Sequence, residues 1–215
     1  TAVGYYALYQ NTTGTTNNAF GRGALGAVTT ADSNCAFGDY ALQANTAAAN
    51  SAFGYRALYT NTTGVNLVAV GKNALYANTT GSSNTAIGMQ SLDANTTGGN
   101  NSAVGNDSLS ANTTGDNNTA VGSDALGNSS TGNRNTAVGK GALLTNTTGS
   151  DNTAFGFAAL DAQSTTSDNS AFGAYALTKN TTGVRNSGLG RATLEENTTG
   201  NDNTAVGHYA LLSNT

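Results

Sequence analysis

The chain has 215 residues, of which 9% are charged, with 28 glycines, no proline and a formal net charge of −4 at pH 7. Its lysines and arginines, 8 in total, offer no basic patch for nucleic-acid phosphates, and no apolar run approaches the length that crosses a membrane. The sequence therefore predicts no nucleic-acid partner and no membrane insertion of this segment.

A repeat of 17 residues runs through the whole chain. Its clearest copy, residues 135–151, reads Asn-Thr-Ala-Val-Gly, two free positions, Ala-Leu, two free positions, Asn-Thr-Thr-Gly and two more free positions. We number the repeat from its first asparagine, so that Asn135 is position 1 and Asp151 is position 17. The period is kept throughout except between Gly38 and Gly54, which are 16 residues apart. So short a period is typical of a stacked repeat fold, and we expect one repetitive domain, residues 1–215.

Within each copy, the residues in chain order favour a strand, a turn, a second strand and a second turn. Asn-Thr-Ala-Val-Gly suits the first short strand, because β-branched and aromatic residues are enriched in strands, and the Ala-Leu segment suits the second. Asn-Thr-Thr-Gly is a turn sequence that recurs too often to leave room for a stable helix. The repeat therefore predicts an all-β fold, a parallel β-solenoid or β-roll of thirteen coils with one coil per copy.

Two apolar columns are predicted to form the core of this solenoid. Position 4 is large and apolar in every copy, and position 9 is always leucine. The position-4 residues are Val3, Phe20, Phe37, Phe53, Val70, Ile87, Val104, Val121, Val138, Phe155, Phe172, Leu189 and Val206. The position-9 residues are Leu8, Leu25, Leu42, Leu58, Leu75, Leu92, Leu109, Leu126, Leu143, Leu160, Leu177, Leu194 and Leu211.

Position 3 is restricted to small residues, with alanine in every copy except one, where Gly188 replaces it. Side chains of neighbouring strand residues point to opposite faces. If position 4 lies in the core, position 3 lies on the outer face, and we expect a second chain to pack against it there. At Gly188 we expect the larger neighbour Leu189 to compensate for the lost volume.

Glycine and asparagine are predicted at the corners of the coils. The position-5 glycines supply the left-handed backbone that a corner needs. They are Gly4, Gly21, Gly38, Gly54, Gly71, Gly88, Gly105, Gly122, Gly139, Gly156, Gly173, Gly190 and Gly207. Asparagines at positions 1 and 12 are expected to stack into amide ladders, and consecutive phenylalanines at position 4 into aromatic stacks.

The stretch Gly-x-x-Asn-Thr-Ala-Val-Gly at residues 132–139, present with isoleucine at 81–88, resembles the head repeat of trimeric autotransporter adhesins. The whole chain is even more similar to the Asn-Thr-Ala-Val-Gly repeat tracts of bacterial and phage proteins described as tail-fibre-like. The resemblance implies a left-handed β-roll in which three identical chains wrap one axis. Neither end of the sequence carries an atypical capping copy, so we expect a segment of a longer fibrous chain that also stacks end to end.

No set of residues predicts catalysis, a cofactor or a metal site. Catalysis needs acids, bases or nucleophiles that converge in a pocket, whereas the single histidine, His208, occupies a freely varying position. The aspartates near corner positions, Asp116, Asp151 and Asp168, lack the dense glycine and aspartate pattern of calcium-binding β-rolls. We therefore expect a protein that is not an enzyme.

Two sequence features point to the surface of the solenoid. Asn-Thr-Thr formally matches an N-glycosylation acceptor, although repeated turn chemistry explains it equally well and is the interpretation we favour. The acceptor asparagines are Asn11, Asn61, Asn78, Asn95, Asn112, Asn146, Asn180 and Asn197. Nine tyrosines occupy variable positions, mostly in the first third of the chain, where exposed rings suit contacts with sugars or with other chains.

The function predicted from these patterns is a structural extracellular fibre, filament or adhesin-like shaft, on a cell surface or a virion. Its partners are expected to be identical chains in a homotrimer, with a host surface or a glycan as ligand. Two alternatives stay open. In the first, the protein binds ice, because aligned Thr-Thr columns resemble the surface of ice-binding β-solenoids; purified protein would then show thermal hysteresis. In the second, the protein is a glycan-binding phage tail fibre, which the tyrosine-rich copies suit.

Overall fold

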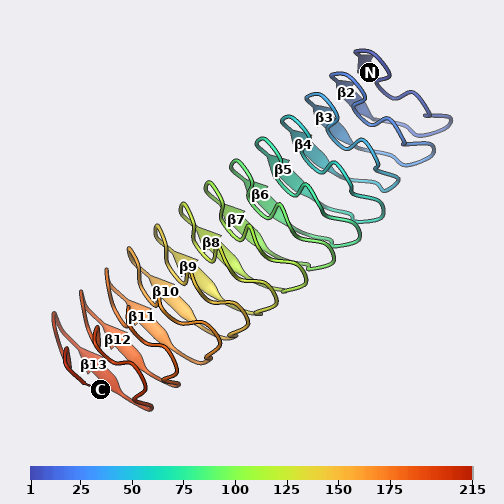
Figure 1. Ribbon diagram of the computed structural model, residues 1–215. Helices are drawn as coiled ribbons and strands as arrows, with labels where there is room; N and C mark the ends of the chain where they lie inside the picture. Colours follow the sequence, from blue (N-terminus) through green and yellow to red (C-terminus); the bar gives the residue numbers. More distant parts are fainter. Residues whose placement is uncertain (215) are drawn as a thin grey trace.

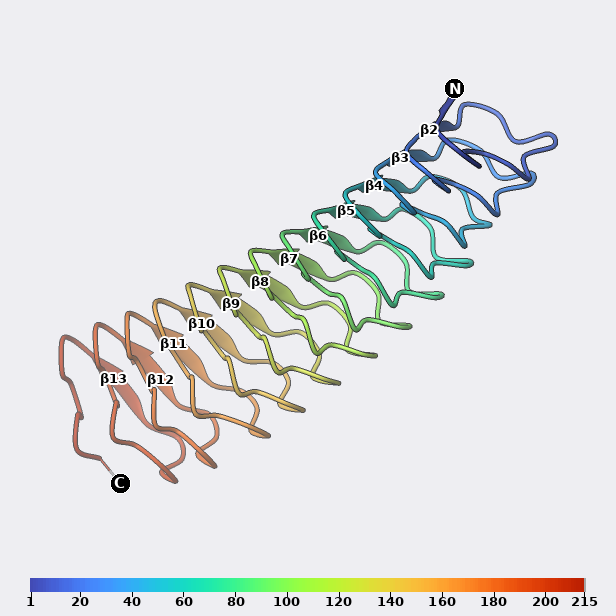
Figure 2. The same ribbon diagram turned by 45° about the horizontal axis from the view of Figure 1, so that its top comes forward.

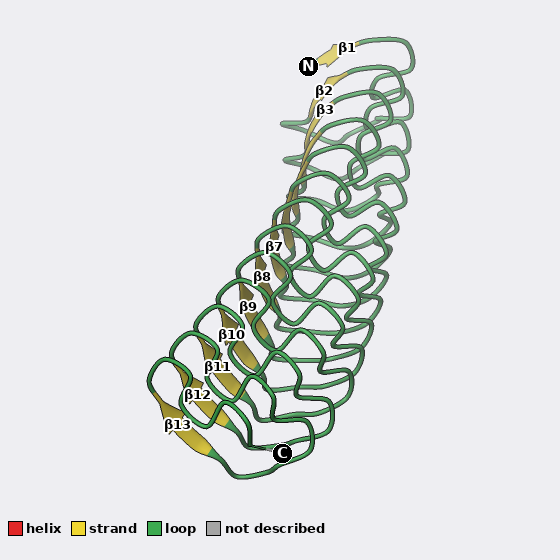
Figure 3. Cartoon of the chain, turned by 60° about the vertical axis from the view of Figure 1, so that its left-hand side comes forward, coloured by secondary structure: helices red, strands yellow, loops and turns green. Residues whose placement is uncertain are grey.

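Each copy of the repeat forms one coil of a parallel β-solenoid, and the coils stack into an elongated rod (Figure 1, Figure 2). This computed structural model describes residues 1–214. Thirteen short strands form one parallel sheet in sequence order. They are β1 (Ala2–Val3), β2 (Asn18–Phe20), β3 (Cys35–Phe37), β4 (Ser51–Phe53), β5 (Val68–Val70), β6 (Thr85–Ile87), β7 (Ser102–Val104), β8 (Thr119–Val121), β9 (Thr136–Val138), β10 (Thr153–Phe155), β11 (Ser170–Phe172), β12 (Ser187–Leu189) and β13 (Thr204–Val206). Figure 3 shows the strands along one side of the rod.

The strands stay in register along the whole rod because equivalent residues lie one repeat apart. In the pairing of β9 with β10, for example, Thr136 is opposite Thr153. The short copy keeps this register, with Cys35 of β3 opposite Ser51 of β4. Its missing residue is taken up in the turn, where the Asn45 side chain donates to a carbonyl two residues further on rather than three. Like residues therefore form columns parallel to the rod axis.

Each coil contains a single strand, so the predicted second strand is absent from residues 1–214. Hydrogen-bonded turns take its place, and position 9 within them has a left-handed backbone, with a φ of 51° at Leu75. For a residue with a side chain, this conformation costs about 1–2 kcal/mol. The Leu75 N–H donates to the carbonyl of Ser91 in the next coil, at 3.0 Å, so the turns extend the ladder of hydrogen bonds around the coil. The sequence favours a strand at this position because leucine, unlike glycine or asparagine, gives no indication of a left-handed turn.

The interior of the coils is narrow, and leucine and alanine fill it. The position-9 leucines are fully buried from Leu25 to Leu194. The alanines of positions 3 and 8 belong to the same cluster. Position 3 therefore points inward: Ala103 is 0% exposed, whereas its neighbour Val104 is 38% exposed. Its restriction to small residues follows from the close packing of this interior beside leucine.

The prediction that position 4 belongs to the core is wrong, as is the prediction that the alanine column lies outside. Because adjacent strand residues face opposite sides, the inward alanine turns position 4 toward solvent. The outward residues are Val3, Phe20, Phe37, Phe53, Val70, Ile87, Val104, Val121, Val138, Phe155, Phe172, Leu189 and Val206. The prediction that Leu189 fills the space beside Gly188 is also wrong, because Leu189 is exposed. The side chain that lies against Gly188 is that of Thr193.

Two buried asparagine columns form a polar part of the interior. At position 12 the amides stack as predicted, and Asn95 Nδ2 donates to Asn78 Oδ1 at 2.8 Å. At position 1 the side-chain oxygen accepts a backbone N–H, as Asn84 does from Asn101 at 2.8 Å. In parts of this column it also accepts from the amide of the next coil, as Asn118 does from Asn135 at 3.2 Å, so the predicted ladder is partly present. The Gly98 carbonyl accepts from both columns, at 2.7 Å from Asn84 and 3.0 Å from Asn95. The asparagine side chains thus form hydrogen bonds within the Asn-Thr-Thr-Gly turn and between neighbouring coils.

Residues 1–214 contain no helix, and hence none with the length and apolar character that would let it span a membrane.

Candidate binding surfaces

The outer face of the sheet carries no charged side chain along the whole rod, and one of its two columns is apolar. Positions 2 and 4 face outward, and no copy has a charged residue at either position. We call the position-4 column, from Val3 to Val206, the strand-face stripe. Its phenylalanines stack, with ring centroids 4.5 Å apart for Phe20 and Phe37 and a nearly parallel pair later in the column. The predicted aromatic stacks are confirmed, although they lie on the surface rather than in the core.

The paired threonines of positions 13 and 14 lie in a turn and not on the sheet. At position 13 the hydroxyl donates to a carbonyl of the next coil, as Thr79 does to Thr96 at 3.0 Å. At position 14 the side chain is exposed, as in Thr80. The sheet carries a separate column of small polar residues at position 2, beside the strand-face stripe. The ice-binding alternative needs the paired threonines to lie on the sheet. They lie instead in a turn on another part of the coil, which counts against this alternative.

The asparagines that match the glycosylation sequence lie inside the coils. All of those after the first coil, Asn61, Asn78, Asn95, Asn112, Asn146, Asn180 and Asn197, are 0% exposed, and Asn11 is partly exposed. A glycan would be attached to the amide nitrogen, which in Asn95 already donates to two protein oxygens. The folded rod therefore gives a transferase no access to these buried sites, and the motif serves the turn.

The residues considered for catalysis or metal binding do not gather into one site among residues 1–214. The His208 ring stacks on Tyr209, with centroids 4.0 Å apart. The corner aspartates, Asp116, Asp151 and Asp168, are exposed on different coils. Among residues 1–214, no three His, Cys, Asp or Glu side chains come together in a way that would hold a metal ion.

Several ion pairs join adjacent coils. At position 17, Arg134 Nε lies 2.7 Å from Asp151 Oδ1 and Arg185 Nε lies 2.6 Å from Asp202 Oδ1. The hydrogen bond and positive charge of Arg134 hold the pKa of the Asp151 carboxyl below its usual value. Arg185 lowers the pKa of Asp202 in the same way. These pairs add charge complementarity to the in-register stacking of the coils.

We expect the substitution Arg134→Ala to raise the pKa of Asp151 toward its ordinary value, as measured by NMR titration of the carboxyl carbon. A lowered carboxyl pKa contributes stability above the unfolded pKa and loses it as the pH falls through the folded pKa. Stability should change little, because both partners are largely exposed. Asp202, which keeps Arg185, is the internal control. An unchanged Asp151 titration in the variant would contradict the assignment of the shift to Arg134.

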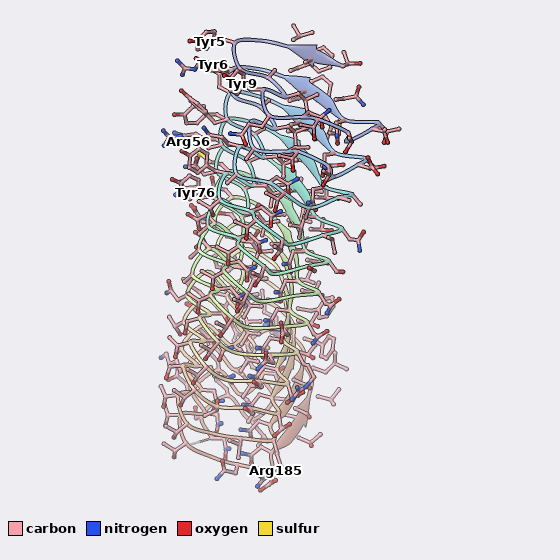
Figure 4. The ribbon with its side chains drawn as sticks, turned by 90° about the vertical axis from the view of Figure 1, so that its right-hand side faces the viewer. Tyr5, Tyr6, Tyr9, Arg56, Tyr76 and Arg185 are labelled. Atoms are coloured by element: carbon pink, nitrogen blue, oxygen red, sulfur yellow. The ribbon has the colours of Figure 1, made fainter. Side chains whose placement is uncertain are left out.

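Aromatic side chains gather on the turn side of the first five coils. We call this cluster the tyrosine face; it comprises Tyr6, Tyr9, Tyr40, Tyr55, Tyr59 and Tyr76. Tyr59 and Tyr76 stack with centroids 5.3 Å apart, and Tyr40 meets Tyr59 edge-on at 6.4 Å. The Arg56 guanidinium lies 5.4 Å from the Tyr59 centroid. Tyr9, Arg56 and Tyr76 lie on the same side of the rod in Figure 4.

A hollow of about 480 Å³ opens in the tyrosine face over the second coil. Gly23 and Gly26 lie in its floor, and Tyr6, Tyr9 and Tyr40 are among its walls. The second copy is the only one with glycine at both position 7 and position 10. In the repeat these two positions vary freely, so the sequence pattern did not predict the hollow. The available signal was this glycine pair between two copies that both have tyrosine at position 7.

No protein-family model matches the chain, and no curated protein or solved structure is significantly similar to it.

Proposed function

We propose that this protein is a structural fibre shaft, displayed outside the cell on a cell surface or a virion, in which three identical chains pack through their strand-face stripes. The observation that carries the proposal is the stripe itself, which is apolar, uncharged and continuous over all thirteen coils. The resemblance of the repeat to adhesin heads and tail-fibre tracts supports the trimer and the extracellular location.

The area of the stripe supports association with a partner. Its side chains remain roughly 40% exposed in the middle of the rod, as at Val104 and Ile87. If each coil withdraws about 60 Å² of this surface from water, the column buries roughly 800 Å² per chain, which is the size of a standard stable interface. A contiguous apolar surface of that size is unusual on a soluble monomer.

The regularity of the stripe favours a second copy of this chain as the partner. Equivalent side chains recur at the spacing of the coils, about 4.8 Å along the rod, and an identical chain offers the same spacing over the same length. Each chain has one such stripe, so parallel chains can close around a common axis with every stripe facing inward. The contact between chains is therefore proposed at the strand-face stripe. It is not at the alanine column, which lies inside each coil.

We expect the triple substitution Val104→Lys, Val121→Glu and Val138→Lys to convert the assembly to monomers. The three side chains point outward on consecutive coils, and alternating signs imitate the native ion pairs, so each coil should still fold. Association of the chains would bury these charged side chains between apolar stripes, away from water, and the cost of removing them from water opposes assembly. Native mass spectrometry and light scattering measure the number of chains, and circular dichroism checks the fold.

A matched control places the same charges on position 11, where Lys179 is native: Ala94→Lys, Ala111→Glu and Asn128→Lys. This variant should keep the wild-type assembly. A wild-type chain that is monomeric at micromolar concentration would refute the proposal, as would equal dissociation of both triple variants.

A further inference from the structure

We propose that the hollow over the second coil binds a neutral pyranose sugar, and that the rest of the tyrosine face carries the following sugars of the same oligosaccharide. The hollow is lined by positions 6, 7, 10 and 11 of the repeat, whereas the strand-face stripe is position 4. The site is therefore separate from the surface through which the chains are proposed to pack.

The shape of the hollow comes from the two glycines. Coils recur about 4.8 Å apart, so Tyr6 and Tyr40, which are two coils apart, are anchored about 10 Å from each other along the rod. Gly26 leaves the space between them open at position 10. Gly23 lets the Tyr40 ring settle against the backbone, because a β-carbon added there would lie 3.0 Å from the ring. The volume of about 480 Å³ falls within the range of small-ligand sites.

The chemistry of the lining suits a sugar. Tyrosine rings offer apolar faces for the C–H groups of a pyranose, and their hydroxyls offer polar tips. Gln10 and Gln43, also in the lining, can both donate to and accept from sugar hydroxyls.

The charges around the hollow favour a neutral ligand. Arg22 lies in the lining, and its guanidinium is 4.7 Å from the Tyr40 ring centroid. Arg22 Nη2 lies 3.8 Å from Asp39 Oδ2, and the Arg22 backbone N–H donates to Asp39 Oδ1 at 2.9 Å. The positive charge of Arg22 is therefore paired within the protein, and the lining of the hollow has no unpaired cation for an acidic sugar.

The tyrosine face continues the site along the rod. Tyr59 and Tyr76 carry stacked rings to the fifth coil, roughly 10 Å beyond Tyr40. Because these two rings stack on each other, they offer a sugar their edges and hydroxyls, which add apolar contact and hydrogen bonds. An oligosaccharide aligned with the rod axis can thus contact several rings, which a single sugar cannot.

Saturation-transfer NMR on the full chain tests the proposal with cellotetraose, maltotetraose and chitotetraose as probes. Sialyllactose tests for an acidic ligand, and mannitol provides hydroxyls without a ring. At least one neutral tetrasaccharide should receive magnetisation from the tyrosines, and mannitol and sialyllactose should not. No transfer to any neutral tetrasaccharide would overturn the proposal, as would transfer to sialyllactose alone.

Two pairs of variants then locate the site. Gly26→Gln fills the hollow and should weaken binding of the responding tetrasaccharide at least tenfold, whereas Gly127→Gln, at the same repeat position in the eighth copy, should leave it unchanged. A β-carbon at either glycine meets a carbonyl of its own coil at 3.2 Å, so the two substitutions load the backbone alike; at Gly127 it also meets the end of the flexible Leu144 side chain at 3.1 Å.

Gly23→Ala should also weaken binding, because its methyl group displaces the Tyr40 ring. Gly141→Ala is the control, since Gly141 has nearly the same φ, 66° against 67°, and an added β-carbon there meets nothing within 4 Å. Equal affinities within both pairs would place the ligand elsewhere and overturn the proposal. The number of chains in the assembly should not change in any of these variants, so this result is independent of the proposed shaft.

Discussion

Asn95→Asp is expected to lower the free energy of unfolding by about 3–5 kcal/mol, the usual penalty for an uncompensated buried charge. The Asn95 side chain is 0% exposed, and its Nδ2 donates to Asn78 Oδ1 at 2.8 Å and to the Gly98 carbonyl at 3.0 Å. Aspartate has nearly the same shape but places an oxygen where the donor was. Two acceptors then face a carboxylate in a site without solvent. Urea unfolding followed by circular dichroism measures the change.

The same substitution should make stability depend on pH. The new carboxyl keeps one donor, Asn112 Nδ2, but its burial and the two acceptors that face it raise its pKa in the folded state. The variant should therefore regain stability as the pH falls and the new side chain takes up a proton. Asn100→Asp is the matched control. Asn100 is exposed at position 17, where Asp151 and Asp202 occur naturally, so this change should be nearly neutral. Equal losses in both variants would contradict the role assigned to the asparagine column.

Gly105→Ala is expected to disrupt the stack locally and to cost on the order of 4 kcal/mol or more, a loss that is exceptional for a single substitution. Gly105 has a φ of 138°, and an added β-carbon would lie 2.5 Å from the carbonyl oxygen of Gly122 in the next coil. Relief requires the two coils to separate, which breaks the hydrogen bonds between them. Thermal unfolding, together with limited proteolysis near the seventh coil, measures the effect.

Gly188→Ala is the control for this prediction. Gly188 occupies the inward position 3, where every other copy has alanine, and an added β-carbon would meet the Thr193 side chain at an ordinary 3.5 Å. The variant should be neutral, or more stable by about 0.5–1 kcal/mol because alanine restricts the unfolded chain. If Gly105→Ala were as stable as Gly188→Ala, that result would contradict the conclusion that the position-5 backbones of neighbouring coils approach too closely to admit a side chain.

The candidate surfaces were predictable to different degrees. The phenylalanine stacks and the position-12 amide ladder follow from the period alone, because in-register stacking places identical residues above one another. The strand-face stripe was assigned to the core, although its residues were correctly singled out. The hollow was missed because its two glycines matter only once Tyr6 and Tyr40 are known to stand on the same side of the rod.

By itself, the sequence determined the architecture of this protein: the strict recurrence of glycine and leucine, with asparagine in most copies, imposes one coil per copy and columns of like residues. Only the tertiary structure decided which way the columns face. Alternation along a strand requires positions 3 and 4 to point in opposite directions, but it does not say which of them points inward. Closure of a coil of 17 residues leaves an interior that holds leucine beside alanine and has no room for a second large column. The large apolar residues are therefore left on the outside, where they provide the surface for association.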